Sequence, residues 1–473
     1  MPPAKSAARD HGFAFAPTVV ERAGIPPKLA VEWLDTMPRI GRNFRADSAA
    51  CSKFWVAGAR LLARMPAKGK RGPDQIATAA FMQMCERELR ERYLAAHAAT
   101  LYDRLTGNRK KFVRVAQLVR GAAKLVPGLA PTDKQLADEA PLMLSDKEGR
   151  EVDQGLFLAH VLADPGCGQH LCHAMLQPLP GWQDKLARLT KEGSLDLGGA
   201  FITRVDKASI VEIRRPRFLN AMDYEWLSDI EAAVDLAILD PQTQIAVLRG
   251  GAVDNPKYQR VFSSGINLTL LYQGKIPYLF YIDHLLGFEH KIFRGLARPD
   301  AVPDDTAGTT AEKPWIAAVD KFAIGGGCQH LLVMDYVLAG KDAYMTLPAR
   351  KEGIIPGASN MRLPRFVGNA VARQAIMMGR RLDCDSPEGR MICDEIVPPE
   401  QMDDALAALI DAMTNSGVVS AVSNRRAFRI GQEPLDTFRR YVAVYAREQA
   451  YCHFSPALIA NLERHWNAMQ RKV

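Results

Sequence analysis

The segments of this chain best suited to catalysis are two turns that contain glycine. One is Phe322 to Gln329, FAIGGGCQ, and the other is Val261 to Leu268, VFSSGINL; each follows an apolar, strand-like run. Glycine lets the backbone approach a ligand closely and direct its N–H groups toward it. Each turn could give one N–H to a single oxygen, which would form an oxyanion hole for an enolate or a tetrahedral intermediate. The alternative is that both turns only pack.

The motifs around these turns resemble those of the crotonase (enoyl-CoA hydratase/isomerase) superfamily, over about residues 197–401. The matching segments are LNA at 219–221, SSGINL, KPWIAAV at 313–319, IGGGCQ, and GIIPGASNMRL at 353–363. The long N-terminal region and the tail REQAYCHFSPALIANLERHW resemble a branch of cofactor-independent dioxygenases within that superfamily. The resemblance implies an α/β, crotonase-like (ββα-superhelix) core that binds acyl-CoA and assembles as a homotrimer or homohexamer.

The resemblance also implies which backbone groups would be catalytic. The two oxyanion donors would be the N–H groups of Ile266 and Gly326. Their neighbours Gly265, Asn267 and Gly327 would contact the substrate. Mutational data on comparable sites assign roughly 3–4 kcal/mol to one such donor.

Two positions that carry catalytic glutamates in enoyl-CoA hydratases hold other residues here. They are Gln329 and Ala349. An amide has no useful basicity and alanine has no proton to exchange, so we expect neither hydration nor a carboxylate in the pocket. The resemblance implies that Gln329 orients a peroxide or the thioester oxygen; the alternative is a buried amide that satisfies backbone groups.

An enolate without an acid–base pair suits one reaction in particular. The α-carbon of an arylacetyl thioester is acidified by the ring and by the carbonyl, and its carbanion can pass an electron to dioxygen and recombine as a peroxide. Collapse onto the thioester carbonyl gives an α-keto acid and free CoA. The resemblance implies this route with O2 as co-substrate and with no metal or flavin. The α-proton acceptor is not identified by the sequence. The alternatives are acyl-CoA hydrolysis, isomerisation or lysis on the same fold, and a non-catalytic acyl-CoA-binding scaffold.

Substrate selectivity is expected at two further positions. The resemblance implies that Met222 stands where the dioxygenase branch has an acid that contacts a ring hydroxyl. It also implies that His284 is the closest match to a basic residue that lines the same pocket. Methionine favours an apolar or differently shaped aryl or heteroaryl ring. His284 could instead be the missing base or could simply pack. Residues expected to hold coenzyme A are Arg217, Phe218, Asn255, Pro256, Lys257 and Tyr258.

The elements that must position these residues follow from periodicity. We expect a mobile tail over 1–50, an α-helical domain over 51–198, the core over 199–401, and a helical region over 402–473 that serves assembly and covers the site. Within the core, a hairpin, a helix over 220–239 and an apolar strand at 245–250 alternate, which predicts a mainly parallel sheet. A helix is expected over 278–296, followed by a polar, mobile loop over 298–312.

The composition of the chain indicates which classes of partner to expect. The net charge is +8, but the basic residues are scattered among acids and form no aromatic–basic groove, so we expect no nucleic acid. No run is apolar enough for a membrane span, and the eight cysteines form no regular framework, which favours a reducing cytoplasm. The cluster Cys167, His170, Cys172 and His173 lacks the second ligand pair of a structural zinc site. We expect a packed helix there and no metal.

Overall fold

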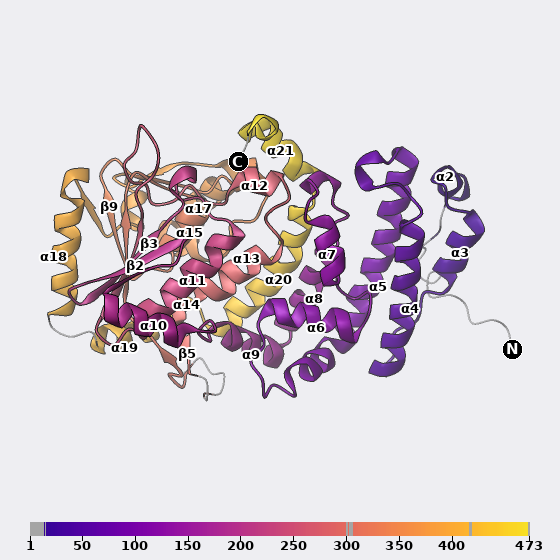
Figure 1. Cartoon of the computed structure of the whole chain (residues 1–473), viewed down its shortest axis with the longest axis horizontal. Helices are drawn as coiled ribbons and strands as arrows, with labels where there is room; N and C mark the ends of the chain where they lie inside the picture. The colour runs from indigo at the N-terminus through magenta and orange to yellow at the C-terminus, as the bar shows by residue number, and fades with distance from the viewer. Residues whose placement is uncertain (1–13, 15, 299–300, 302–305, 416–418, 472–473) are drawn as a thin grey trace.

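The computed structural model describes residues 14, 16–298, 301, 306–415 and 419–471. The N-terminal part is helical, and helices α2 to α5 lie at one end of the long axis of the molecule (Figure 1). The helices of this part are α2 (Pro17–Arg22), α3 (Pro27–Asp35), α4 (Phe44–Leu62), α5 (Pro73–Thr106), α6 (Val115–Leu125), α7 (Asp133–Glu139), α8 (Val152–Ala163), α9 (Pro165–Met175) and α10 (Trp182–Glu192).

The expectation of a mobile tail over 1–50 is wrong for residues 17–50. These residues form α2, α3 and the start of α4. Trp33 is buried and stacks on Phe54, with ring centroids 4.6 Å apart. Its indole Nε1 donates to the carbonyl oxygen of Phe54 at 3.0 Å. Helix α3 therefore docks on α4, and α2 packs on α5. Both helices are too short to repeat a helical pattern in the sequence. Residues 1–13 lie outside the described residues.

A seven-stranded sheet forms the centre of the second half of the chain. Its strand order is β1-β2-β3-β4-β7-β9-β12. β1, β2 and β3 pair in antiparallel fashion, and the remaining neighbours pair in parallel. The strands are β1 (Ser194–Asp196), β2 (Ala200–Val205), β3 (Ala208–Ile213), β4 (Ile245–Gly250), β7 (Trp315–Val319), β9 (Tyr336–Gly340) and β12 (Glu395–Val397). The mainly parallel sheet is confirmed, but the core begins at Ser194, because β1 already pairs with β2.

The parallel strands at the centre of this sheet are buried on both faces. Every residue of β7 is buried, and so is every residue of β4 except Arg249. Parallel strands read as continuous apolar runs because helices cover both of their faces. Helix α11 (Tyr224–Leu239) packs on β2, β3 and β4.

A smaller three-stranded sheet carries one of the two glycine turns. Its order is β11-β10-β8, with β8 (Phe322–Ile324) parallel to β10 (Tyr344–Thr346) and β11 (Leu382–Asp383) at the edge. Helix α15 (Gly326–Leu331) begins directly after β8.

The C-terminal part of the chain is helical, and one of its helices returns to the N-terminal helices. The C-terminal helices are α18 (Met402–Thr414), α19 (Val419–Gln432), α20 (Leu435–His453) and α21 (Pro456–Trp466). Helix α20 packs along α8 and so joins the N-terminal helical part to the core (Figure 1). Helix α21 packs on α12 (Leu268–Tyr272) and α16 (Ala349–Glu352), the two short helices beside the glycine turns. No helix among the described residues has the length and apolarity needed to cross a bilayer.

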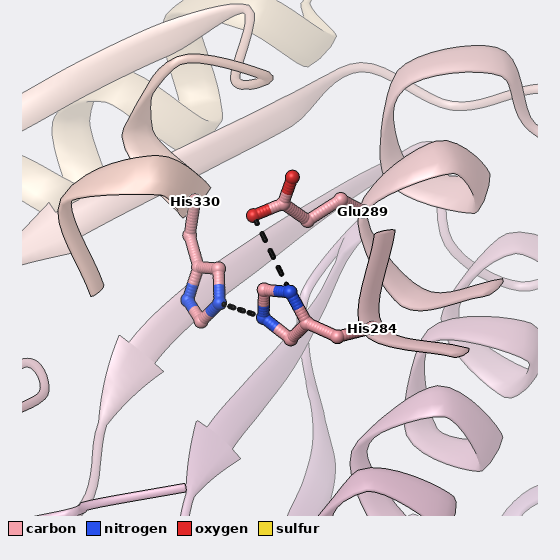
Figure 2. Close-up of side chains that lie close together, drawn as sticks. All are labelled: His284, Glu289 and His330. Atoms are coloured by element: carbon pink, nitrogen blue, oxygen red, sulfur yellow. Dashed lines mark hydrogen bonds and ion pairs between the residues drawn. The ribbon is translucent and has the colours of Figure 1, made fainter. Parts of the chain in front are cut away.

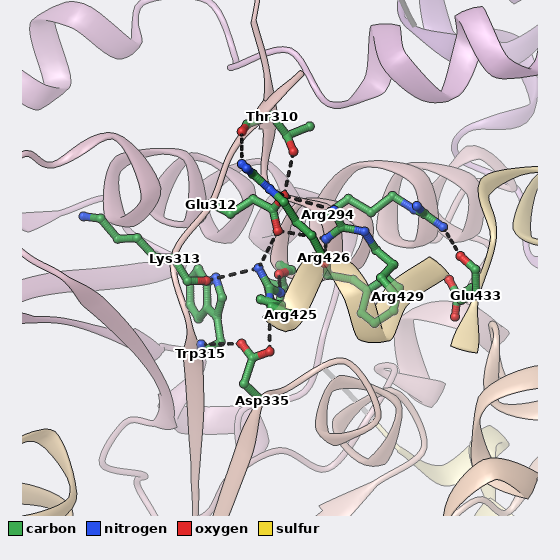
Figure 3. A network of polar contacts seen from close by, with 12 residues as sticks. Arg294, Thr310, Glu312, Lys313, Trp315, Asp335, Arg425, Arg426, Arg429 and Glu433 are labelled. Atoms are coloured by element: carbon green, nitrogen blue, oxygen red, sulfur yellow. Dashed lines mark hydrogen bonds and ion pairs between the residues drawn. The ribbon is translucent and has the colours of Figure 1, made fainter. Parts of the chain in front are cut away.

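Helix α19 is fastened to the core by a buried carboxylate (Figure 3). The side chain of Glu312 is fully buried and pairs with three arginines of α19, at 3.4 Å for Arg425 and 2.8 Å for both Arg426 and Arg429. Arg425 also pairs with Asp335 at 2.8 Å. The expected mobile loop over 298–312 is therefore wrong at its end, because Glu312 is held on all sides; residues 299–300 and 302–305 lie outside the described residues.

Candidate active site

The turn after Val261 is held in place by the asparagine of the LNA motif. Asn220 is buried, and its Nδ2 donates to the carbonyl oxygens of Gly251 and Val261, both at 2.9 Å. Its own carbonyl oxygen accepts from Ser263 Oγ at 2.9 Å. Asn220 has φ of 55°, a left-handed conformation that asparagine tolerates better than most residues. The motif therefore fixes the backbone of the turn.

The N–H of Ile266 is left facing the second turn. Met222 N donates to Gly265 O at 2.7 Å, and Asn267 N donates to Met222 O at 2.9 Å. Met222 and Ile266 thus form a parallel bridge, in which Met222 bonds to the residues before and after Ile266. The N–H of Ile266 itself therefore points away from Met222. The segment of Gly265 and Ile266 lies against the end of β8, because a Cβ on Gly265 would lie 2.7 Å from the carbonyl oxygen of Ile324. Gly265 also has φ of +83°, so glycine is required there.

The second amide belongs to the first residue of α15. Gly326 occupies the N1 position, where the N–H has no partner within the helix. In the part of the chain that the structure describes, neither Gly326 N nor Ile266 N donates a hydrogen bond to another backbone group. Both residues line one cavity, together with Gly325. Two amides without a backbone acceptor thus belong to residues that line one cavity, as the two donors of an oxyanion hole would.

The cavity is narrow and mostly apolar. Its volume is about 30 Å³, which is room for little more than one water. Six residues that the sequence singled out line it: Met222, Ile266, His284, Gly326, Gln329 and Ala349. Three more stand beside it: Gly265 and Asn267 shape the first turn, and a Cβ on Gly327 would meet Ser263 at 2.9 Å.

Gln329 is positioned by a glycine of the GIIPG segment. A Cβ on Gly357 would lie 2.1 Å from Gln329 Oε1, so only glycine leaves room for the amide. Gly357 also has φ of +47°, which glycine adopts most easily. Gln329 itself is 9% exposed, toward the cavity. The segment that follows β10 therefore sets the position of the amide predicted to hold substrate.

Met222 lies directly over the second amide. A Cβ on Gly326 would fall 1.9 Å from Met222 Cε and 3.1 Å from its Sδ. The side chain is 2% exposed. The thioether therefore fills the space beside Gly326 and reduces the volume left for a ligand.

His284 lies on a π-helix that interrupts the helix expected over 278–296. The segment divides into α13 (Leu279–Asp283), the π-helix η4 (His284–Glu289) and α14 (His290–Arg294). Figure 2 shows His284 between two partners: its Nε2 is 3.0 Å from His330 Nε2, and its Nδ1 is 3.9 Å from Glu289 Oε1. Burial, with Arg362 nearby, lowers the pKa of His284 to about 3, so the imidazole is neutral.

These three side chains are also the one cluster of metal-ligating groups found among the described residues, with ligand atoms within 4.8 Å of one another. Glu289 Oε2 accepts from Arg362 Nη1 at 2.8 Å. The two imidazoles already share a hydrogen bond through their Nε2 atoms. The cluster thus consists of two neutral, hydrogen-bonded imidazoles beside the ion pair of Glu289 and Arg362. A metal would have to displace the hydrogen bond between the imidazoles.

The expectation of a pocket without a carboxylate is wrong. Glu352, the last residue of α16, lines the cavity. It follows Ala349 by three residues, and residues at i and i+3 share one face of a helix. Burial raises the pKa of Glu352 to about 7. The helical spacing from Ala349 was the signal that could have found it.

Three aromatic side chains also escaped the sequence interpretation. Phe280, Tyr281 and Tyr445 line the cavity, the first two from α13 and the third from α20. Tyr281 hydroxyl and His453 Nδ1 are 3.1 Å apart. The contribution of α20 required knowledge of the tertiary fold, because more than 150 residues separate it from α13 in the chain.

The residues predicted to bind coenzyme A lie outside this cavity and close to one another. Asp254 N donates to Pro216 O at 3.1 Å, which joins the segment of Arg217 and Phe218 to the loop 255–258. Asn255 Oδ1 accepts from Lys257 N at 2.9 Å, and the Tyr258 ring meets Phe322 edge-on at 5.5 Å. Arg217, Pro256 and Lys257 are exposed. Their role in binding stays a prediction.

The Cys167 and His170 region forms helix α9, as expected. His170 Nδ1 is hydrogen-bonded to the Tyr102 hydroxyl at 2.7 Å, and its ring stacks on Phe112 with centroids 5.0 Å apart. Both cysteines of this helix are buried.

Comparison with known proteins gives a consistent result. The family described as enoyl-CoA hydratase/isomerase matches residues 206–442. The (3,5-dihydroxyphenyl)acetyl-CoA 1,2-dioxygenase of Amycolatopsis orientalis is 44% identical over 416 residues, which cover 87% of this chain and 94% of that protein. A probable enoyl-CoA hydratase of Rhizobium meliloti (strain 1021) is 28% identical over 43% of this chain and 70% of its own length.

Solved structures are similar to part of the chain. An enoyl-CoA hydratase from Mycobacterium avium subsp. paratuberculosis K-10 superposes with a TM-score of 0.47 and 20% identity. The match covers 56% of this chain and 98% of that one.

Proposed function

Because the chain belongs to the enoyl-CoA hydratase/isomerase family, we propose that it is a cofactor-independent dioxygenase of an arylacetyl-CoA thioester. The family confirms the crotonase-like fold that the motifs predicted. The activity is supported by the dioxygenase relative, which aligns over most of both chains and not over the core alone.

The observation that carries the proposal is the pair of unused amides, Ile266 N–H and Gly326 N–H, at one small cavity. They stabilise the thioester oxygen as it becomes an enolate oxygen. Hydration in this family uses two carboxylates, whereas Glu352 is the single carboxylate among the described residues that line the cavity. The site therefore supports enolate formation better than the addition of water.

The proposed reaction balances with dioxygen alone. The enolate reduces O2 and forms a Cα–O bond, the peroxide attacks the thioester carbonyl, and the C–S bond breaks. Cleavage of the O–O bond then leaves an aryl α-keto acid, with one oxygen atom of O2 on each of the two carbons, and CoA thiol. Gln329, which lies against Gly357, would orient the peroxide or the thioester oxygen.

The ring of the substrate would lie among apolar and aromatic side chains. Met222 cannot accept a hydrogen bond from a ring hydroxyl as a carboxylate would. An aryl or heteroaryl group with fewer hydroxyls than the 3,5-dihydroxyphenyl ring therefore fits this site better. A benzene-sized ligand needs a cavity of about 150 Å³, so binding must shift side chains such as Met222 away from their unliganded positions.

Met222→Ala should widen the range of rings that the enzyme accepts. Removing the thioether frees the space that now lies over Gly326. We expect kcat/KM for a ring one or two carbons larger to rise about 10-fold relative to the best wild-type substrate, since each methylene in a pocket discriminates by about 10–200-fold. Paired oxygen-uptake assays on both thioesters measure this ratio. An unchanged ratio would show that Met222 does not limit the ring.

Coenzyme A would bind outside the cavity, at the exposed cations Arg217 and Lys257. Charge-assisted hydrogen bonds to phosphate favour such residues. The C-terminal region 402–473 would both cover the site, through α20 and α21, and mediate assembly into a homotrimer or homohexamer. The reaction as proposed needs no metal or flavin.

An oxygen electrode tests the proposal directly. Arylacetyl-CoA thioesters are supplied in metal-free buffer with chelator, and oxygen uptake is compared with the release of CoA thiol. We expect the two to be equal for at least one thioester, with no effect of chelator. Release of thiol under anaerobic conditions would instead identify a hydrolase.

A further inference from the structure

A carboxylate with no partner faces the reaction cavity. The side chain of Glu352 makes no hydrogen bond or ion pair with any other residue in the described ranges, although the residue is only 9% exposed. It ends α16, and Gly353 follows in a left-handed conformation with φ of +82°. Helix α21 closes over this point, because a Cβ on Gly353 would lie 3.0 Å from Leu458 Cα.

The carboxylate lies beside the second oxyanion turn. Glu352 Oε1 is 4.0 Å from the place that a Cβ would take on Gly325, the residue before the Gly326 amide. In a bound thioester the α-carbon is one bond from the carbonyl carbon whose oxygen the amides hold. A base at this end of the cavity is therefore near the proton that must leave.

The other titratable groups at the cavity are neutral. They are Tyr281 of α13, His284 of η4 and Tyr445 of α20, and no lysine or arginine is among the described lining residues. From α21, Leu458 and Asn461 meet Gly353, and neither carries a charge. Burial is accordingly the one cause that raises the pKa of Glu352 to about 7, near the value that suits a general base at neutral pH.

We propose that Glu352 is the catalytic base that accepts the α-proton of the thioester, an assignment that rests on the proposed dioxygenase function. His284 is a poorer acceptor, because its Nε2 is engaged with His330 and its pKa lies at about 3. Gln329 and Met222, the other polarisable groups beside the amides, have no useful basicity.

The proton transfers balance over one turnover. A carboxylate oxygen of Glu352 takes the first α-proton, and the C–H electron pair becomes the enolate double bond. After the peroxide attacks the thioester carbonyl, the departing CoA thiolate takes that proton and leaves as the thiol. The free carboxylate then accepts the second α-proton as the O–O bond breaks and the α-carbonyl forms, and it releases this proton to water.

Glu352→Gln tests the assignment because it keeps the shape and removes the basicity. We expect kcat for oxygen uptake to fall by about 10²–10⁴-fold with KM near the wild-type value. Without oxygen, in deuterated water, the wild-type protein should exchange the α-protons of the arylacetyl-CoA, which proton NMR follows, and the variant should lose exchange to a similar extent. Glu352→Asp should retain part of both rates. Glu32→Gln, on the exposed face of α3, should change neither.

The dependence of kcat on pH is a second test of the assignment of Glu352. Below pH 7 the wild-type carboxyl is protonated and cannot accept a proton, so kcat should rise with pH through about 7 and then level off. Glu352→Gln should lack this rise.

Two results would overturn the assignment of Glu352 and leave the proposed dioxygenase function standing. One is an α-exchange rate in Glu352→Gln equal to that of the wild type, and the other is an effect on KM alone for hydroxylated rings. A wild-type protein that neither consumes oxygen nor exchanges α-protons would overturn the function itself.

The fold of Glu352→Gln is not expected to suffer. The pKa of Glu352 is higher in the folded protein than its ordinary value of 4.5, so ionisation costs stability as pH rises from 4.5 to 7. An uncharged amide escapes this cost. At pH 8 the variant should therefore unfold at a denaturant concentration equal to or above that of the wild type, which separates lost chemistry from lost structure.

Discussion

Gly326→Pro, introduced together with Met222→Ala, should lower kcat for oxygen uptake by about 10²–10³-fold, the effect of removing one oxyanion donor. Proline has no N–H, and the N1 position of a helix accepts it without losing an intrahelical hydrogen bond. Met222→Ala supplies the space, because the methionine Cε lies 1.9 Å from where the new Cβ would stand.

The matched control is Gly326→Ala in the same Met222→Ala background. It adds a Cβ at the same place but keeps the amide, so it should retain most of the rate of Met222→Ala alone. Circular dichroism of both double variants checks that α15 and its surroundings fold. Equal rates for the proline and alanine variants would mean that Gly326 N–H does not hold the reacting oxygen.

Glu312→Gln should lower the free energy of unfolding by about 3–5 kcal/mol, the cost of leaving buried charges without their partner. Arg425, Arg426 and Arg429 converge on this fully buried carboxylate. The same network reaches β7, because Asp335 pairs with Arg425 and accepts from Trp315 N at 2.7 Å (Figure 3). Urea unfolding measures the loss.

The control is Glu192→Gln, which removes an exposed pairing with Arg188 and should cost less than about 1 kcal/mol. A pH series adds a further check. Burial opposes the ionisation of Glu312, but its arginine partners, Arg429 above all, hold its pKa below the ordinary 4.5. The stabilisation is thus complete above pH 4.5 and is lost as the pH falls through the folded-state pKa. A loss in Glu312→Gln no larger than that of the control would contradict the account of how α19 is held.

The central part of the fold could be predicted because its signals are local. The apolar runs of β4 and β7, the alternation of the β2–β3 hairpin and the glycines after β8 each depend on neighbouring residues. The helical character of the region over 51–198 could be predicted as well, since a long helix such as α5, at Pro73–Thr106, repeats its pattern many times.

What could not be predicted depends on contacts between distant segments. Helices α2 and α3 are short, and the docking of Trp33 on Phe54 appears only in three dimensions. Glu312 lies in a stretch that reads as a loop, and its burial follows from arginines more than a hundred residues later. The π-helix at 284–289 has the same apolar pattern as the α-helix expected there.

The residues of the candidate site also fall into those that local motifs predict and those that depend on distant contacts. Ile266 and Gly326, the proposed backbone donors, follow from glycine turns and family motifs. Met222, His284 and Gln329, which line the same cavity, follow from motif positions. Glu352 does not follow from the family motif, because the motif places the carboxylate at the position of Ala349 and Glu352 comes one helical turn later. Tyr445 comes from α20, which no local pattern connects to the cavity.

The central claim is that both oxygen atoms of one O2 molecule enter the product of an arylacetyl-CoA without any cofactor. Turnover under ¹⁸O2 in metal-free buffer, followed by mass spectrometry of the acid product, measures this most directly. We expect an aryl α-keto acid carrying two ¹⁸O atoms, formed in equal amount with CoA thiol. An arylacetic acid without ¹⁸O, or an α-keto acid with only one ¹⁸O atom, would contradict it.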